Sequence, residues 1–273
     1  GGVDGAAGTA PGTRVLVGGM GRLGGGGRGH GSDADGMVAH QAAEGVEETD
    51  AQTKATSVVQ ELLRLLGLAG PDPQLIVDPG LRPEGKGGPL VRSLAGYASY
   101  YERWSLTWEA QALLRATPVA GDADLGRAFC DLIRPIRWLE GGVSAPGIRE
   151  IRTLKARMEA ERLPRGADPK THFKLGLGGL SDVEWTAQLI QLRHAFEIEG
   201  LRTTGTLAAL AAAAAAGLVP PTAVETMSRA WAFASPLRNA SRLWPCRPVD
   251  APPSHLANAG RIGRTGGCGA RGG

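Results

Sequence analysis

The sequence has few cysteines, no long apolar run and almost no net charge, and each of these absences excludes a class of protein. Its three cysteines, Cys130, Cys246 and Cys268, are too far apart for a Cys-x-x-Cys metal pair and too few for a disulfide framework. No apolar segment approaches the roughly 18 to 20 residues of a membrane span, and the first residues lack a basic start followed by an apolar core. A formal net charge of +3 gives no electrostatic reason to expect a nucleic-acid partner. We therefore expect a cytoplasmic protein with no membrane and no nucleic acid as partner.

Glycine, by contrast, is in excess. The chain has 42 glycines among 273 residues, about twice the ordinary share of roughly 7%. They gather at the two ends and in the segment 18–31, and residues 1–12 and 244–273 show no helical or strand period. We expect both of these ends to be disordered. The apolar fraction of 42% is near the globular norm, so the residues between the ends can bury a core.

The most informative segment places the glycine-rich run from Gly19 to Gly25 shortly before Ser32-Asp33-Ala34-Asp35. In an extended chain alternate side chains share a face, so Asp33 and Asp35 would point one way and Ala34 the other. Two carboxylates on one face can hold Mg²⁺, which prefers oxygen ligands and usually takes one or two carboxylates plus phosphate oxygens. The pattern therefore predicts metal-assisted chemistry on a nucleotide. A solvated turn is the alternative, because neither motif is specific by itself.

The same glycines imitate the fingerprint of a dinucleotide-binding Rossmann unit. Gly19, Gly21 and Gly24 have the required spacing and follow the apolar run 15–17. Such a unit needs a helix of several turns at the third glycine and an acidic residue about 20 positions further on. Here more glycines follow at 25–27, and glycine costs about 1 kcal/mol per residue relative to alanine inside a helix. We therefore reject the Rossmann interpretation.

Periodicity predicts an α+β region followed by a helical region. Strands are expected at 14–18, 33–40 and 75–78, with a helix at 51–66 and a long aromatic-rich helix at 94–116. The pattern breaks around 118–124, where we place a domain boundary. Further helices are expected at 124–134, 145–162, 181–198, 204–217 and 221–243. Ser181 is predicted to cap the third of these, with Glu184 three residues later.

A third acid, Asp78, ends the strand-like run 75–78, and the sequence around it resembles a known family. The blocks that carry the resemblance are GMGRLGG, GSDAD, VDPGLRPEGKGGPLVRSLAGYASYYERWSLTWEAQALLRA, IREIRTLKARMEAERLPRGADP and KLGLGGLSDVEWTAQLIQLRHA. They are similar to the glutamine synthetase adenylyltransferases, members of the polymerase-beta-like nucleotidyltransferase superfamily. The resemblance implies a nucleotidyltransferase domain at 13–118 and an α-helical bundle domain at 119–243, between the disordered start at 1–12 and a disordered or aberrant tail at 244–273.

The resemblance also implies a metal site and a reaction. Asp33 and Asp35 would bind Mg²⁺, with Asp78 as the third carboxylate near the attacking hydroxyl. AMP would pass from ATP to a tyrosine hydroxyl of glutamine synthetase, and pyrophosphate would leave. Such a transfer asks the protein for positioning and charge neutralisation, and Asp78 could accept the tyrosine proton.

Four further residues are expected to contact the phosphates of ATP. Gly31 and Ser32 would cradle them, as the resemblance implies. Arg82 and Lys86 follow the strand that ends at Asp78 and are candidates for phosphate contacts, with solvation at the surface as the alternative for Lys86. A PII-type nitrogen regulatory protein is a possible second protein partner besides glutamine synthetase.

Several alternatives stay open. Members of the family usually have two related halves, one that attaches AMP and one that removes it by phosphorolysis, and the run 174–185 looks more like the attaching half. Gly27 replaces an acidic residue of the family and Gly36 an apolar one, which should loosen the strand that carries Asp35. The resemblance is expected to stop after Leu243. One alternative is therefore a catalytically impaired fragment that only binds glutamine synthetase or a nitrogen regulatory protein. The adenylyl-removing half is another. A uridylyltransferase is less well supported, because the segments GLRPEGKGGPL and LPRGADP look specific to the adenylylating family.

Overall fold

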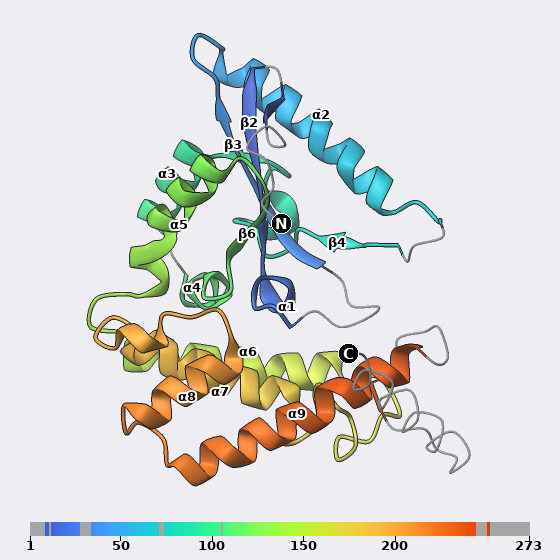
Figure 1. Ribbon diagram of the computed structural model, residues 1–273, viewed down its shortest axis with the longest axis vertical. Helices are drawn as coiled ribbons and strands as arrows, with labels where there is room; N and C mark the ends of the chain where they lie inside the picture. The colour runs from blue at the N-terminus through green and yellow to red at the C-terminus, as the bar shows by residue number, and fades with distance from the viewer. Residues whose placement is uncertain are drawn as a thin grey trace, which may run out of the picture. The chain divides into compact units, whose positions relative to one another are not determined.

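The computed structural model describes residues 9–10, 12–27, 34–70, 74–104, 106–243 and 250–251. The chain divides into two compact units, the first comprising residues 1–28, 33–142 and 203–205 and the second the remainder. Figure 1 shows a sheet with helices around it in the first unit and packed helices in the second. The two expected disordered ends fall almost wholly outside the described residues.

The boundary between the units lies near Gly142, further along the chain than the predicted boundary at residues 118 and 119. The predicted boundary falls inside strand β6 (Thr117–Gly121), which pairs with β2 (Thr13–Gly19) in antiparallel register. Helix α5 (Ala123–Arg137) follows β6, and its buried side chains join the core of the sheet. Both elements therefore stay with the first unit, because strand pairing and packing hold them there.

Strand β3 (Ala34–Ala42) is central to the sheet. It runs antiparallel to β2, and it runs parallel to the two short strands β4 (Val77–Asp78) and β5 (Arg92–Ser93). Strand β1 (Thr9–Ala10) extends the sheet beyond β2. This mixed sheet confirms the expected α+β class and differs from the parallel sheet of a Rossmann unit.

Helices cover both faces of the two long strands. On one face α2 (Glu48–Leu66) packs Ala55 and Val59 against Val15 and Val38. On the other face α3 (Leu94–Trp104) and α5 close a larger core (Figure 1). The main buried members of that core are Leu16, Met20, Met37, Tyr97, Leu113, Phe129 and Ile133. Strands buried on both faces are apolar at successive positions, which explains the continuous apolar run at 15–17.

The aromatic-rich segment 94–116 forms two helices, so the prediction of one long helix was wrong. Helix α3 ends at Trp104, and α4 (Thr107–Leu113) begins after Leu106, whose backbone N–H donates to a carboxylate oxygen of Glu109 at 3.0 Å. That hydrogen bond caps a new helix start, because it satisfies an N–H that the first turn leaves without a partner. Of the aromatic residues of α3, Tyr97 and Tyr101 are buried in the core, whereas Trp104 is exposed.

The second unit is helical in its described residues. Helices α6 (Ala145–Arg162) and α9 (Pro221–Leu243) have the predicted bounds, while α7 (Leu180–His194) and α8 (Thr206–Ala215) are shorter than predicted. Helices α7 and α8 share a core of Val183, Ala187, Ala209 and Leu210, and Val224, Met227 and Trp231 of α9 pack against it. No helix in the described parts of the chain is both long and apolar enough to cross a membrane.

Two contacts in the second unit depart from the sequence analysis. Ser181 is buried inside α7 and is not its cap; Asp182 instead accepts a hydrogen bond from the backbone N–H of Gly178 at 2.6 Å. Asp250 lies in the segment expected to be an aberrant tail, yet its carboxylate accepts from Arg238 Nε at 2.5 Å. This part of the tail therefore contributes to the packing of the second unit.

Candidate functional site

Asp35 and Asp78 lie side by side on neighbouring strands. They are register partners in the parallel pair β3 and β4, and the N–H of Ala34 donates to the carbonyl of Ile76 at 2.8 Å. Partners on adjacent strands are about 4.8 Å apart and point to the same face. Asp35 is half-buried and Asp78 is exposed. The structure thus brings together two of the three predicted carboxylates, whereas Asp33 lies outside the described residues, as do Gly31 and Ser32.

The glycine-rich turn meets the carboxylate of Asp35 directly. Gly21 has a φ of +50°, and a Cβ atom there would lie 2.2 Å from Asp35 Oδ2. The backbone N–H of Met20 donates to the carbonyl of Asp35 at 2.8 Å. The helix that follows, α1 (Gly21–Gly24), is a single turn, which agrees with the rejection of a Rossmann helix. The sequence showed Gly21 only as part of the glycine-rich run and gave no sign of its contact with Asp35, which is a close approach that only glycine permits.

The far end of this turn is fixed as well. A Cβ atom on Gly24 would lie 1.8 Å from the carbonyl oxygen of Arg115, and Thr117 Oγ1 donates to the Gly24 carbonyl at 3.0 Å. These contacts tie the turn to the residues that lead into β6. The turn beside Asp35 is therefore held at both ends by backbone contacts.

The loop after β4 is ordered by Arg82. Its guanidinium is buried and donates to the carbonyls of Pro79 at 2.7 Å, Gly88 at 3.1 and 3.2 Å, and Lys86 at 3.4 Å. Asp78 Oδ1 accepts from the Gly80 N–H at 2.8 Å. Lys86 is exposed in the short 3₁₀ turn at 85–87. The four hydrogen bonds give Arg82 a role inside the loop, and Lys86 is the exposed cation of the two.

Gly36 does not disturb strand β3. It pairs in register with Gly19, and the next pair joins Met37 to Gly18. A Cβ atom on Gly36 would lie 3.3 Å from Val77 Cγ1, so β4 packs closely at this position. The expected loosening of the strand is not seen here. At Gly27, the other position where the sequence departs from the resembled family, a Cβ atom would have nothing within 4 Å.

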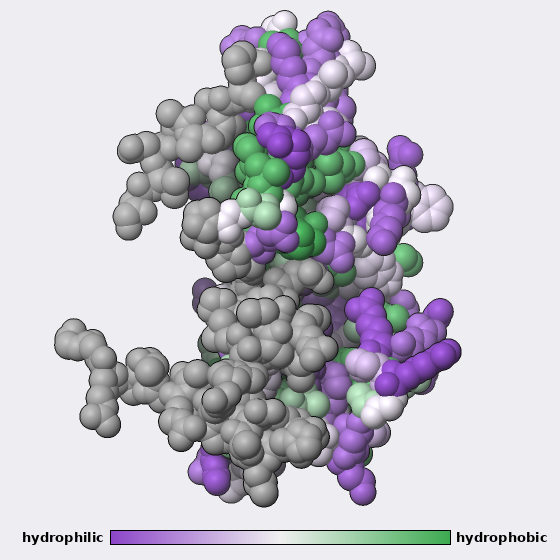
Figure 2. Space-filling model, turned by 90° about the vertical axis from the view of Figure 1, so that its right-hand side faces the viewer, coloured by the Kyte–Doolittle hydropathy of each residue, from purple (hydrophilic) through white to green (hydrophobic). Residues whose placement is uncertain are grey.

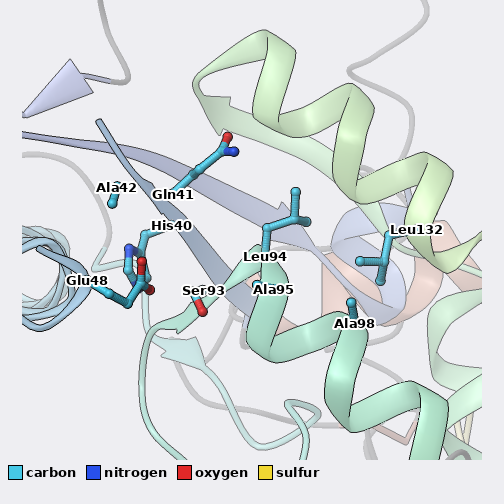
Figure 3. A pocket seen from close by; sticks show the side chains of 9 residues that line it. All are labelled: His40, Gln41, Ala42, Glu48, Ser93, Leu94, Ala95, Ala98 and Leu132. Carbon is cyan, nitrogen blue, oxygen red and sulfur yellow. The ribbon is translucent and has the colours of Figure 1, made fainter. Parts of the chain in front are cut away.

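A cavity of about 450 Å³ lies at the other end of β3 (Figure 3). Figure 3 shows it lined by His40, Gln41, Ala42, Glu48, Ser93, Leu94, Ala95, Ala98 and Leu132. His40 is five residues beyond Asp35, roughly 17 Å along the strand. Its Nε2 lies 2.8 Å from Gln52 Oε1, and Gln52 Nε2 donates to the carbonyl of Val91. The buried histidine thus joins the sheet to α2, apart from the carboxylate pair.

The described residues contain no cluster of three or more His, Cys, Asp or Glu side chains that could hold a metal. The pair of Asp35 and Asp78 supplies two carboxylates, and Asp33 is outside the described residues.

Large apolar side chains are exposed on α2 and in the segment that follows it. Val58, Leu62 and Leu65 belong to α2, and Leu68 and Ile76 lie between α2 and β4, with exposures from 36% to 53%. We call these five residues the apolar stripe. Figure 2 faces this side of the molecule and shows hydrophobic residues gathered on the upper part of the surface. The stripe contains none of the predicted site residues.

Comparisons with known proteins give two family matches. Residues 2–131 match the glutamate-ammonia ligase adenylyltransferase family, and residues 149–266 match the GlnD PII-uridylyltransferase family. The second match, which is to a different family, extends beyond Leu243 to residue 266.

Individual relatives are similar over nearly all of the chain. A Streptomyces coelicolor protein is 55% identical over 252 residues, which are 92% of this chain and 25% of the relative. A Mycobacterium avium protein is 53% identical over 246 residues, 90% of this chain and 24% of the relative. Each is a bifunctional glutamine synthetase adenylyltransferase/adenylyl-removing enzyme. The chain spans about a quarter of the length of these relatives.

Proposed function

We infer that this chain, a homologue of a segment of the bifunctional glutamine synthetase adenylyltransferase/adenylyl-removing enzymes, transfers AMP from ATP to a tyrosine hydroxyl of glutamine synthetase. The observation that carries the proposal is the pairing of Asp35 with Asp78 on adjacent parallel strands, beside the glycine turn at Gly21. The polymerase-beta-like domain is proposed for the first unit, and a helical bundle domain for the second.

The carboxylate pair fits Mg²⁺. Carboxylate oxygens are the ligands this ion prefers, and two protein carboxylates leave room for phosphate oxygens. Asp33 precedes Asp35 by two residues, and in an extended strand residues two apart have their side chains on the same face. An extended backbone at Asp33 would therefore place its carboxylate on the face that carries Asp35. When bound, the ion would neutralise the triphosphate and orient its α-phosphate. We propose Asp33, Asp35 and Asp78 as its ligands.

The protein residues would then perform positioning and proton transfer. The tyrosine oxygen forms a bond to the α-phosphorus, the bond from that phosphorus to the bridging oxygen breaks, and pyrophosphate leaves. Asp78 is exposed on the strand edge and is proposed to accept the tyrosine proton. Gly31 and Ser32 are proposed to cradle the phosphates.

Lys86 is proposed as the phosphate contact of the loop after β4, because its ammonium is exposed. Arg82 serves the same site indirectly, since its guanidinium donates to the loop carbonyls. Four of the five N–H donors of this buried guanidinium are directed at loop carbonyls, which leaves little of it to bind phosphate. We therefore propose Arg82 as the residue that orders the loop that presents Lys86.

Partners follow from the relatives. Glutamine synthetase is the proposed protein substrate, since the relatives are named for acting on it. The match of residues 149–266 to a PII-uridylyltransferase family supports a PII-type regulatory protein as a further partner.

The removal of AMP by phosphorolysis is the second candidate function, because the relatives are named for both attaching and removing the adenylyl group. In attachment the tyrosine oxygen displaces pyrophosphate from the α-phosphorus of ATP, and in removal a phosphate oxygen displaces the tyrosine from the phosphorus of bound AMP, which yields ADP. Both are displacements at the phosphorus of AMP, so the geometry of Asp35 and Asp78 fits both.

The test incubates the purified chain with α-labelled ATP, Mg²⁺ and glutamine synthetase, beside an Asp35→Asn variant. Label on the synthetase that is absent with the variant would support transfer. A parallel reaction supplies adenylylated synthetase and phosphate, and release of labelled ADP there without forward transfer would assign the chain to removal. A folded chain that does neither, but binds the synthetase, would be the impaired binder.

A further inference from the structure

Glu84 has a backbone conformation that residues other than glycine rarely adopt. Its φ is 62° and its ψ is 7°, and it is the only non-glycine residue with a positive φ in the described part of the chain. Such a conformation persists only where the surroundings over-determine it, and these residues gather at functional sites. Glu84 lies between Asp78 and Lys86, in the loop that follows β4.

Arg92 holds the side chain of Glu84. Its Nη2 lies 2.5 Å from Glu84 Oε2, and the arginine side chain is only 18% exposed. The backbone of Arg92 belongs to β5, where it is the register partner of Ala39 on β3. The ion pair therefore attaches the loop to the sheet that carries Asp35.

Arg92 is itself held by an aromatic ring. The guanidinium carbon lies 5.3 Å from the centroid of Tyr100, within the range of a cation–π contact. The Tyr100 hydroxyl donates to Glu109 Oε1 at 2.8 Å, and Glu109 Oε2 accepts from the N–H of Leu106 at 3.0 Å. Burial is the largest cause that raises the pKa of Tyr100, and the hydrogen bond to Glu109 is the next. The phenol therefore stays protonated and can donate to Glu109. A continuous set of contacts thus runs from Glu84 to the start of α4.

The turn that begins at Glu84 contains Lys86. The N–H of Gly85 donates to the carbonyl of Arg82 at 2.8 Å, and the N–H of Gly87 donates to the carbonyl of Glu84 at 3.1 Å. A change in the backbone at Glu84 would therefore move Lys86 relative to Asp78.

We propose that Arg92 is a positioning residue for nucleotidyl transfer: by holding Glu84 in the left-handed conformation, it sets the conformation of the loop that follows Asp78 and carries Lys86. The proposal rests on the proposed function, which supplies the reaction that the loop serves. Exposed ion pairs usually contribute little. In this pair Glu84 is 53% exposed, but Arg92 is only 18% exposed and lies over the Tyr100 ring, and a planar guanidinium loses little freedom on binding.

The test combines Arg92→Gln with Glu84→Gly. Glycine adopts the left-handed region at almost no cost, so Glu84→Gly removes the need for the ion pair. In Arg92→Gln we expect kcat/KM for ATP to fall roughly tenfold, and in the double variant to return within about threefold of Glu84→Gly alone. Arg64→Gln is the matched control, because it breaks the exposed Arg64–Glu61 pair on α2 and should leave kcat/KM unchanged.

Hydrogen exchange of residues 79–91 in the chain alone provides a readout that needs no activity. Faster exchange in Arg92→Gln that Glu84→Gly reverses is the expected result. Unchanged exchange would refute the positioning role, as would a double variant as slow in transfer as Arg92→Gln. A wild-type chain that transfers no AMP would instead refute the proposed function, so the two failures are distinguishable. If Arg92→Gln does not fold, Arg92→Lys repeats the test, since lysine keeps the charge but loses the planar fork.

Discussion

Gly21 and Asp35 are so close that no side chain larger than hydrogen fits between them: a Cβ atom on Gly21 would lie 2.2 Å from Asp35 Oδ2. The glycine turn and the first carboxylate of the candidate site are therefore one structural unit. Any substitution that moves the turn also moves the carboxylate.

Gly21→Ala is accordingly expected to reduce AMP transfer by roughly a hundredfold, because an error of about 1 Å in a reacting group can cost that much. The free energy of unfolding should also fall, by about 1 to 3 kcal/mol, since alanine must adopt a positive φ. Transfer assays and urea unfolding measure the two effects. Gly26→Ala is the matched control, because Gly26 has a φ of +69° but nothing within 4 Å of a Cβ atom. Equal loss of transfer in both variants would show that the contact with Asp35 is not the cause.

Substitutions of Arg82 and Lys86 are expected to differ in effect: one should lower the stability of the protein, and the other should weaken ATP binding. Arg82→Ala removes the donor of the Pro79 and Gly88 carbonyls, and we expect it to lower the free energy of unfolding by about 2 to 3 kcal/mol. Lys86→Ala should leave stability within about 0.5 kcal/mol, because the side chain is exposed, and should raise the KM for ATP several-fold. Urea unfolding and steady-state kinetics test both. If Arg82→Ala is as stable as the wild type but has a raised KM for ATP, Arg82 itself, and not only Lys86, would be a phosphate contact.

Asp250 should stabilise the second unit. Its partner Arg238 is almost fully buried, so Asp250→Asn would leave a buried guanidinium without its counter-charge. We expect a loss of about 2 to 4 kcal/mol in the free energy of unfolding. Asp131→Asn breaks the exposed pair with Arg134 and should cost less than about 1 kcal/mol. Equal effects of the two substitutions, measured by urea unfolding, would contradict the structural role of this part of the tail.

The buried tyrosines should make the protein less stable in alkali. Burial is the main cause that raises the pKa of Tyr97 and Tyr101 far above the ordinary value of about 10. Above that value the unfolded state has released protons that the folded state retains, so the free energy of unfolding falls as the pH rises. The slope approaches about 1.4 kcal/mol per pH unit for each tyrosine.

Absorbance at the phenolate band, recorded with urea unfolding, checks this dependence. Phenolate should appear at the ordinary pKa only after unfolding. Tyr97→Phe should reduce the pH dependence of the free energy of unfolding by the contribution of one tyrosine, about 1.4 kcal/mol per pH unit. The substitution also removes the hydrogen bond to the Val38 carbonyl. Ordinary titration of all the tyrosines in the folded chain would contradict the burial of Tyr97.

Local signals predicted much of the secondary structure. Helices α6 and α9 have their predicted bounds because each begins at a residue that starts helices: Ser144 accepts from the N–H of Gly147, and Pro221 occupies a first helical position. Strand β2 was predicted from its apolar run. By contrast, the break after Trp104 was missed, because it depends on a hydrogen bond between Leu106 and Glu109 in a segment whose aromatic spacing is helical throughout.

By itself, the sequence determined the α+β class and the order of the main helices. It also carried the resemblance through which Asp33, Asp35 and Asp78 were proposed as one site. All of these depend on the identity and spacing of residues along the chain. Only the tertiary structure decided that Asp35 and Asp78 are register partners, that β6 belongs to the first unit, and that Arg82 serves its own loop. Each of these depends on hydrogen bonds and packing between atoms whose positions are set by the fold of the whole unit, and periodicity carries no information about them.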